Sequence, residues 1–384
     1  MPQSYVAHYR QHKPSMFIAP DSISERPRRI PRPVNAVPAP AARWINPLTE
    51  PDWDATLALS DRGADFFHTS GWARVLHSSY GYLPLYLTER KQGRIVGLIA
   101  LMEIDTWLTG KRGVSLPFSD DCKPVAADAN TYASYLQQIV GEARERGWKK
   151  ISLRGGRAFL PETTASICYW SHTIDLTPDD SVKWERLAPA TRRAVKKASK
   201  SRLTVTISTE ENDLDRFYQL FCQTRKRHGV PPPGPNFFGN IYRHVLAKGN
   251  GTVILAHQDG RTIAGGVYFH FGSCVHMKFS ASNLSCQCVR PNNLVMWTAI
   301  QHFTQRGFRT LLLGRTSLAN TGLRHFKASW GSQEGLIEYF TYDCRRERFV
   351  VQPDRANAWP SRLVRLLPDC LSRVIGSTLY RHAG

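Results

Sequence analysis

A short sequence pattern occurs twice in this chain, about 160 residues apart, and it constrains the fold more than any other feature. The first copy is RGWKKISL at Arg146–Leu153, and the second is RGFRTLLL at Arg306–Leu313. In each copy a helical pattern ends at a glycine, and an aromatic residue, a basic residue and an apolar strand follow. A spacing this long indicates two large duplicated units and not a solenoid of short repeats.

The order of predicted elements around the two copies supports a duplication. The first half is predicted to contain helices at 51–60 and 71–79, strands at 83–88 and 94–104, a helix at 130–146, and strands at 149–153 and 167–176. The second half is predicted to contain a strand at 203–207, helices at 211–228 and 236–248, strands at 252–257, 262–271 and 274–281, a helix at 292–306, a strand at 310–313, a helix at 319–328 and a closing strand at 335–342. The expected fold class is α/β, as an α+β mixed sheet in two tandem units.

The length of 384 residues suits two domains. We expect a Pro/Arg-rich tail that cannot bury enough apolar surface to fold, and a basic amphipathic C-terminal extension. The expected boundaries are 1–44 for the tail, 45–180 for the N-terminal domain, 181–202 for a basic linker helix, 203–345 for the C-terminal domain that carries the site, and 346–384 for the extension.

The formal net charge of +20 predicts attraction to polyanions. The longest apolar stretch, Ile95–Met102, is far below the roughly 20 residues that span a bilayer, and no secretory leader pattern opens the chain. We therefore expect a cytoplasmic protein, peripheral at the inner membrane surface at most. Cys286 and Cys288 form an isolated C-x-C without a second ligand pair, so no metal site is expected.

Three segments could carry chemistry, and the first is the basic pattern at 184–200 between the halves. Its apolar residues can form one helical stripe, made of Leu187, Ala190, Ala194, Val195 and Ala198. Its basic residues crowd the other faces, at Arg192, Arg193, Lys196, Lys197 and Lys200. Like charges four residues apart destabilise a helix, and arginine matches phosphate oxygens in two contacts. The segment indicates a phosphate site at a domain junction, or alternatively a solvated basic face.

The second segment, Pro291-Asn292-Asn293, opens a predicted helix directly after a strand and loop. The free backbone N–H groups of such a helix N-terminus attract a phosphate or an oxyanion. An ordinary capped helix start is the alternative interpretation, because proline and asparagine are both favoured there.

The third segment runs from Gly314-Arg315-Thr316 to Gly322–Gly331, and it follows a strand end where ligands bind in open sheets. Within it, Lys327 stands beside Phe326, and a lysine there can stabilise charge that develops on an acyl oxygen. The alternative is a surface lysine that a helix C-terminus favours.

Taken in order, these segments resemble the FemAB-type peptidyltransferases and the related GNAT-like proteins of exopolysaccharide and exosortase loci, over about residues 45–345. The resemblance implies twin GNAT-like (acyl-CoA N-acyltransferase) domains. It implies that Arg193, with Thr191 beside it, contacts the phosphate of a nucleotide-sugar or lipid-linked substrate, and that Lys327, with Phe326, is the catalytic residue in transfer from aminoacyl-tRNA. The expected substrate-binding residues are Thr191, Arg193, Asn292, Asn293, Arg315 and Phe326.

Two departures from the family pattern leave the acyl donor open between acyl-CoA and aminoacyl-tRNA. The long helical arm that some family members carry for tRNA is absent from the second half. The glycine-containing acetyl-CoA loop of standard GNAT enzymes is also absent, because Gln287–Asn292 reads QCVRPN.

The sequence therefore predicts an acyltransferase without a bound cofactor, which transfers an aminoacyl or acetyl group to an amine or hydroxyl of a cell-envelope or exopolysaccharide precursor. The expected partners are a phosphorylated or lipid-linked sugar precursor, with an anionic membrane surface and tRNA as further candidates. The candidate general bases are His276, Glu338 and Tyr339. No Gly-x-Ser-x-Gly, P-loop or His-Glu-x-x-His motif is present, which argues against a serine hydrolase, an NTPase or a zinc protease.

A non-catalytic scaffold for polyanions or a membrane surface is the alternative function. The charge supports it, as does the stretch Trp359–Tyr380, where leucines and valines can line one face of an interfacial helix with arginines around them. Packing of that stretch back onto the second half is the competing interpretation. Nucleic-acid binding fits the charge too, but no recognised DNA or RNA motif is present.

Overall fold

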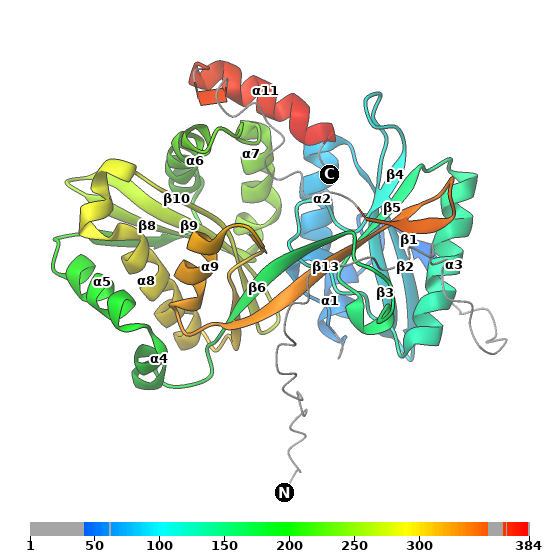
Figure 1. Ribbon diagram of the computed structural model, residues 1–384, viewed down its shortest axis with the longest axis horizontal. Helices are drawn as coiled ribbons and strands as arrows, with labels where there is room; N and C mark the ends of the chain where they lie inside the picture. The colour runs from blue at the N-terminus through cyan, green and yellow to red at the C-terminus, as the bar shows by residue number, and fades with distance from the viewer. Residues whose placement is uncertain (1–41, 61–62, 352–363, 366, 383–384) are drawn as a thin grey trace, which may run out of the picture.

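The structure is a computed structural model that describes residues 42–60, 63–351, 364–365 and 367–382. Fourteen strands of the described chain form one mixed sheet that runs through both halves, and helices cover it (Figure 1). Most of the predicted tail, up to residue 41, lies outside the described residues. The predicted fold class, an α/β protein with a mixed sheet, is confirmed.

The first half follows the predicted order, with short strands added. Its elements are β1 (Arg43–Ile45), α1 (Trp53–Ala58), the 3-10 turn η1 (Phe66–His68), α2 (Ser70–Tyr80), β2 (Leu83–Lys91), β3 (Arg94–Ile104), β4 (Arg112–Val114), α3 (Ala129–Glu145), β5 (Lys150–Arg154), η2 (Arg157–Phe159) and β6 (Ile167–Asp175). The β2–β3 hairpin turns at Gln92 and Gly93, whose φ angles of 50° and 76° match the tight turn that favours glycine. As predicted, α3 stops before Gly147, which has a φ of 70°.

The second half keeps its predicted order too. Its elements are α4 (Asp180–Arg186), α5 (Pro189–Ser199), β7 (Thr204–Ser208), α6 (Glu211–Arg227), α7 (Pro235–His244), η3 (Leu246–Lys248), β8 (Gly251–Gln258), β9 (Arg261–Phe271), β10 (Cys274–Ser282), η4 (Leu284–Val289), α8 (Pro291–Gln305), β11 (Thr310–Leu312), β12 (Thr316–Ser317), α9 (Thr321–Ala328), β13 (Gln333–Asp343), β14 (Arg348–Val350) and α11 (Asp369–His382). The basic linker is two helices in place of one. Ala188 is extended before Pro189, because a residue that precedes proline avoids the helical region.

The last long strand does not close the sheet of the second half alone, as the sequence predicted. Instead β13 lies between β5 and β6, and it pairs with both in antiparallel register. In turn β6, which comes from the first half, pairs with β11 and β12. These two strands cross the middle of the molecule and join the halves into one sheet (Figure 1).

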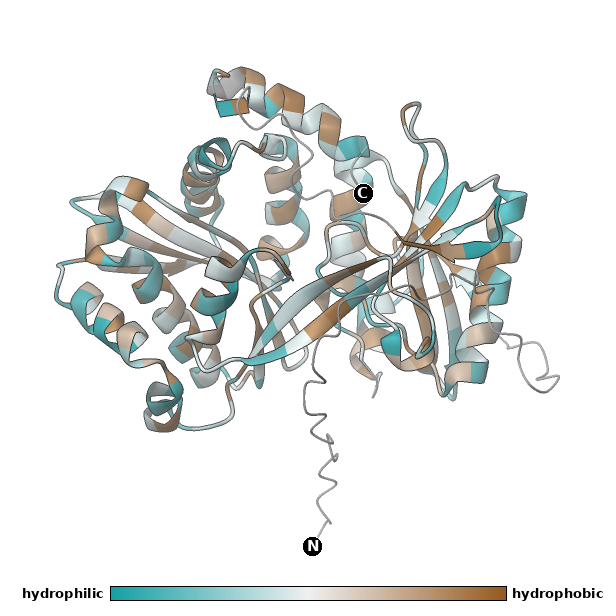
Figure 2. Cartoon of the chain, in the orientation of Figure 1, coloured by the Kyte–Doolittle hydropathy of each residue, from teal (hydrophilic) through white to brown (hydrophobic). Residues whose placement is uncertain are grey.

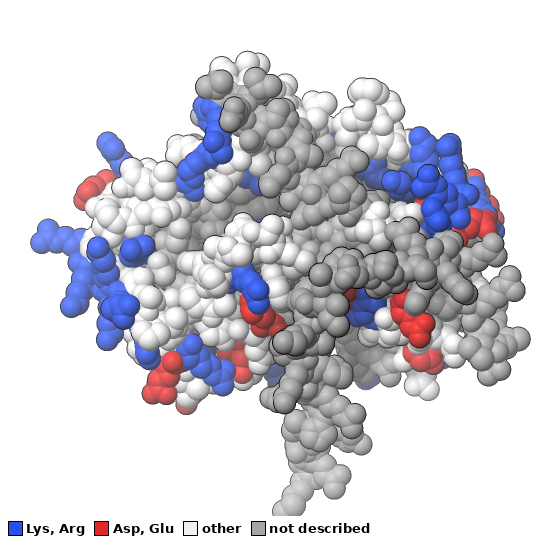
Figure 3. All heavy atoms as spheres, viewed as in Figure 1, with Lys and Arg blue, Asp and Glu red and all other residues white. Residues whose placement is uncertain are grey.

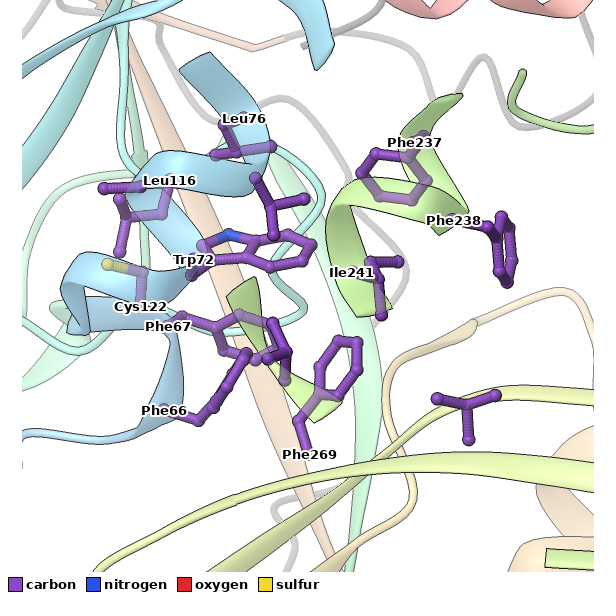
Figure 4. Close-up of a cluster of buried hydrophobic side chains, with 14 of the residues drawn as sticks. Phe66, Phe67, Trp72, Leu76, Leu116, Cys122, Phe237, Phe238, Ile241 and Phe269 are labelled. Carbon is purple, nitrogen blue, oxygen red and sulfur yellow. The ribbon is translucent and has the colours of Figure 1, made fainter. Parts of the chain in front are cut away.

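Aromatic side chains from both halves form a shared core where the halves meet. Figure 2 shows apolar residues along the strands and the covering helices of both halves, and one buried cluster contains residues of both. The ring of Phe66 lies 4.7 Å from that of Phe269, and Trp72 lies 6.1 Å from Phe237 (Figure 4). Phe66 and Trp72 come from the first half and the other two from the second. An interface built this way is a hydrophobic core and not a wet contact between separate domains.

The C-terminal helix α11 lies across the top of α6 and α7 in Figure 1. The first part of the predicted amphipathic stretch, up to residue 363, falls outside the described residues. Within α11, Ser372 is buried against the protein, whereas Leu371 and Val374 are 49% and 62% exposed. This helix packs back onto the protein. Every helix in the described ranges is too short or too polar to cross a bilayer.

Candidate functional site

A groove of about 810 Å³ lies within the second half, and not between the halves as the sequence suggested. One wall is α5, the opposite wall is the start of α8, α9 closes the end, and β9 and β10 form the floor. Five of the seven predicted site residues line it, namely Thr191, Arg193, Asn292, Asn293 and Phe326.

The α5 wall presents Arg193 and Lys197 to the groove. These side chains are exposed because Val195 and Ala198, on the other face of α5, are buried. Thr191 is only 5% exposed, and its hydroxyl donates to the Ser329 hydroxyl at 2.8 Å. Thr191 therefore ties α5 to the end of α9.

The α8 wall presents a helix N-terminus that no side chain caps. Arg290 precedes the helix with a φ of 58°, so it occupies the left-handed position that glycine favours, and this explains how the loop turns without a glycine. The amide of Asn292 donates to the Ser282 hydroxyl at 3.1 Å, which fixes the start of the helix. Free N–H groups and the helix dipole make such a terminus a binding site for phosphate.

The charge of the groove is one-sided. Arg193, Lys197 and Arg290 line it, and among the residues that the structure describes no aspartate or glutamate does. Figure 3 shows Lys and Arg side chains gathered at the left of the view, where α5 lies in Figure 1. Cations on facing walls repel one another unless an anion lies between them, so the electrostatics of the groove favour an anionic ligand.

Phe326 lines the groove, but the neighbouring Lys327 points away from it and is only 3% exposed. The Lys327 ammonium donates to the backbone oxygens of Gly314 at 2.8 Å and Arg315 at 3.2 Å. Burial lowers the pKa of Lys327 to about 8, although the charge of Asp120 works in the opposite direction. An ammonium has three N–H donors, so these two bonds leave one for another acceptor.

Arg315 also lies outside the groove. Its Nη1 donates to the Tyr339 hydroxyl at 2.9 Å, and its guanidinium lies 4.6 Å from the Tyr169 ring centre. Its Nε lies 3.8 Å from a carboxylate oxygen of Asp120. Arg315 is thus part of a charged cluster where the two halves meet.

That cluster borders a second hollow of about 260 Å³, the interdomain pocket, which is lined by Phe118, Asp120, Phe221, Arg225, Pro233, Phe237, Lys278, Phe279, Ser280, Arg315 and Tyr380. Ser280 lines the groove as well, so both hollows border this residue. Burial raises the pKa of the Asp120 carboxyl, but Lys278 and Arg315 outweigh it and hold that pKa below its ordinary value.

Two of the three candidate general bases are already hydrogen-bonded, and the third is buried. His276 is 5% exposed, and its Nε2 lies 3.7 Å from a carboxylate oxygen of Asp65. Glu338 accepts from Arg157 at 2.7 Å, and the Tyr339 hydroxyl donates to the backbone oxygen of Asp120 at 2.6 Å. None of the three lines the groove or the interdomain pocket.

The sequence analysis missed Arg290, Asp120 and Lys278 as site residues. Arg290 carried a signal, because it directly precedes the predicted helix start. Asp120 and Lys278 come from different halves, and only the fold brings them within 3.5 Å. In the described part of the chain, no three His, Cys, Asp or Glu side chains gather as a metal site would require.

Residues 189–328 match the family model of the acetyltransferase (GNAT) domain. The structure is similar to FemX with a TM-score of 0.62 at 14% identity, covering 74% of this chain and 94% of FemX. It is similar to a tandem GNAT protein from the clavulanic acid biosynthesis pathway, with a TM-score of 0.50 at 10% identity over 79% of this chain and 98% of the other.

A conserved protein of unknown function from Bacteroides thetaiotaomicron gives a TM-score of 0.50 at 14% identity, covering 78% of this chain and 98% of the other. No curated protein matches the chain. The family match places a GNAT-type domain at residues 189–328, as the resemblance predicted, and the similarity to FemX shows the same fold over most of the chain.

Proposed function

We propose that this chain is a FemAB-like acyltransferase with a GNAT-type domain. In this proposal the groove binds the phosphates of the acyl donor, and the acceptor enters the interdomain pocket. The one-sided charge of the groove carries this proposal. Arg193, Lys197 and Arg290 line it together with the uncapped start of α8, and no acidic residue of the described chain lies among them. The proposal retains the predicted contact of Arg193 with phosphate and assigns that phosphate to the donor.

The size of the groove supports the assignment to the donor. At about 810 Å³ it falls in the range of about 300–1,000 Å³ that holds cofactor-sized ligands, whereas the interdomain pocket of about 260 Å³ holds less. Acyl-CoA and aminoacyl-tRNA, the two candidate donors, both carry their acyl group on an adenosine-containing, phosphate-rich body. The donor is one of these two.

The acceptor is an amine or a hydroxyl of a cell-envelope or exopolysaccharide precursor, and its reacting end meets the acyl group near Ser280, the residue that lines both hollows. In the transfer step the acceptor forms a bond to the acyl carbon, and the bond from that carbon to the thiol or ribose oxygen of the donor breaks. The proton lost by the acceptor ends on that leaving group. Holding both reactants in line supplies much of the rate.

Lys327 is the proposed catalytic residue, although it lines neither hollow. The proposal requires the acyl group to reach past Phe326 to the remaining N–H donor of Lys327, which then stabilises the negative charge that develops on the acyl oxygen. The bonds to Gly314 and Arg315 fix the ammonium in position. Asn292, Asn293 and Phe326 shape the donor end of the groove, and Arg315 lines the acceptor side.

Mass spectrometry tests the proposal. Purified protein is incubated with an envelope-precursor extract and either acetyl-CoA or charged tRNA, and products are identified by the mass of the added acyl group. We expect product with one donor and a loss of about 100-fold or more in the rate with Lys327→Ala, which is the scale for removing one oxyanion donor. Arg193→Ala should raise the donor KM. Absence of product with both donors, or equal rates in these variants, would overturn the proposal.

A further inference from the structure

The C-terminal helix α11 forms one side of the interdomain pocket, although it lies outside both acyltransferase-like halves. Tyr380, in its last turn, is the α11 residue that lines the pocket. Its ring centre lies 5.7 Å from that of Phe118, and its hydroxyl accepts from Nη2 of Arg225 at 2.5 Å. The ring of Tyr380 therefore meets side chains of both halves over the pocket.

Side chains of the first half hold the end of α11 in this place. The Tyr82 hydroxyl donates to the backbone oxygens of Tyr380 at 2.9 Å and Arg381 at 3.0 Å, and Arg112 donates to that of His382 at 2.7 Å. The last carbonyls of a helix lack partners within the helix, so these bonds satisfy them. The first half thus caps α11 and fixes the position of Tyr380.

The second half holds the middle of α11 by close backbone contact. A Cβ at Gly376 would lie 1.8 Å from the backbone oxygen of Pro232, and a Cβ at Gly234 would lie 2.7 Å from the Cβ of Ser377. Glycine is required at both places, because any larger residue would push α11 away from the loop below it. The helix therefore sits in one defined register over the pocket.

The pocket below α11 carries surplus positive charge. Arg225, Lys278 and Arg315 line it, and Asp120 is the one carboxylate that lines it within the described ranges. Lys278 and Arg315 lie 3.5 and 3.8 Å from that carboxylate. In the described part of the chain, Nε of Arg225 is buried without a hydrogen-bond partner. Unsatisfied buried donors are costly, so this arrangement favours an anionic ligand.

The remaining walls are aromatic, made of Phe118, Phe221, Phe237 and Phe279. Such rings pack against a body with apolar faces, such as a sugar ring. The volume of about 260 Å³ is below the range of ordinary small-molecule pockets, about 300–1,000 Å³, so the occupant is compact.

We propose that α11 is a roof that restricts the interdomain pocket to a compact, phosphate-bearing sugar end of the acceptor, and that Tyr380 sets the size limit. The phosphate meets Arg225 and Lys278, and the sugar ring lies against the phenylalanines. The assignment of this ligand as the acceptor rests on the proposed function, whereas the size and charge selection does not depend on turnover.

Calorimetric binding tests the roof directly with two sugar phosphates of different size. Glucosamine 6-phosphate is the compact probe, trehalose 6-phosphate is the larger one, and glucosamine serves as the probe without phosphate. We expect the wild-type protein to bind the compact probe at least about tenfold more tightly than the larger one, a difference of about 1.4 kcal/mol, and to bind glucosamine weakly.

Four variants isolate the roof. Tyr380→Ala removes the ring that covers the pocket, and Gly376→Ala pushes α11 away from the loop below it. In both variants the ratio of the two dissociation constants should fall to about threefold or less. Tyr380→Phe keeps the ring and should keep the ratio. Val374→Ala changes an exposed residue on the outer face of α11 and serves as the matched control. If Tyr380→Ala does not fold, Tyr380→Leu takes its place.

Two further variants separate the pocket from the groove. Binding of glucosamine 6-phosphate should weaken about tenfold or more in Arg225→Gln and stay unchanged in Arg193→Ala. An unchanged size ratio in both roof variants, binding that depends on Arg193 in place of Arg225, or no binding by the wild type would overturn the inference. Size selection without any acyl transfer would leave the roof intact and count against the proposed function alone.

Discussion

At the scale of single residues, Lys327 has the most unusual environment in the candidate site. It is buried, and its ammonium bonds to the backbone that carries Arg315. Arg315 in turn faces Asp120 from the other half. Lys327 therefore links the groove side of α9 to the cluster at the interdomain pocket, where the proposed transfer takes place.

The lowered pKa of Lys327 leads to a pH prediction. With a pKa of about 8, the side chain is charged below that pH and loses its charge as the pH rises through it. If the ammonium stabilises the acyl oxygen, kcat should fall above about pH 8. Arginine stays charged throughout this range, so Lys327→Arg should lack that decline even if its rate is lower. A pH profile of kcat checks this, and the same decline in the arginine variant would assign it to another group.

At the scale of elements, the groove depends on how α9 docks against the junction of α4 and α5. The backbone N–H of Ala188 donates to the oxygen of Ser329 at 2.9 Å, next to the bond between Thr191 and Ser329. Gly331 follows with a φ of 70°, and a Cβ there would lie 2.9 Å from the backbone oxygen of Arg186. This glycine is what allows the close approach.

Gly331→Ala should therefore destabilise the protein by about 1–3 kcal/mol, since alanine is strained at this φ and has no room. It should also raise the donor KM, because the α5 wall shifts relative to α9. Urea unfolding and donor titration measure the two effects. Gly322→Ala is the control, since a Cβ there meets nothing closer than 4.0 Å. Equal stability of the two variants would contradict the docking described here.

The sequence was sufficient to predict most elements and the groove residues, because these depend on local signals. The β2–β3 hairpin, the glycine stop of α3 and the start of α8 follow from turn and capping chemistry. No local sequence pattern identifies Asp120 and Lys278, because these residues come into contact only when the two halves pack together. The burial of Lys327 was missed for the same reason, as the carbonyls that receive it lie on another element.

At the scale of the whole molecule, the two halves are bound together by exchanged strands. Because β13 lies between β5 and β6, these two strands of the first half pair with a strand that comes from near the end of the chain. The shared aromatic core adds contacts such as that of Phe66 with Phe269. The predicted division at 45–180 and 203–345 stays a proposal about two related units that fold as one body.

We therefore expect a single cooperative unfolding transition for the whole chain, because neither half keeps a complete sheet without the other. Circular dichroism and tryptophan fluorescence in urea should give coincident midpoints. A fragment of residues 45–180, which lacks β13, should lack stable structure. Two separated transitions, or a folded fragment, would contradict this account.

Binding of the donor to the groove is the most direct test of the central claim. Calorimetry with coenzyme A and with a short RNA hairpin that ends in CCA would be compared across wild type, Arg193→Ala and Lys200→Ala. Arg193 lies within α5 and Lys200 is the C-cap of the same helix, so each variant removes one positive charge, but Lys200 does not line the groove. For the ligand that binds, we predict about tenfold weaker binding in Arg193→Ala and no more than about a twofold change in Lys200→Ala. Equal losses in both variants would show that the positive charge attracts polyanions without a specific site, and would contradict the account.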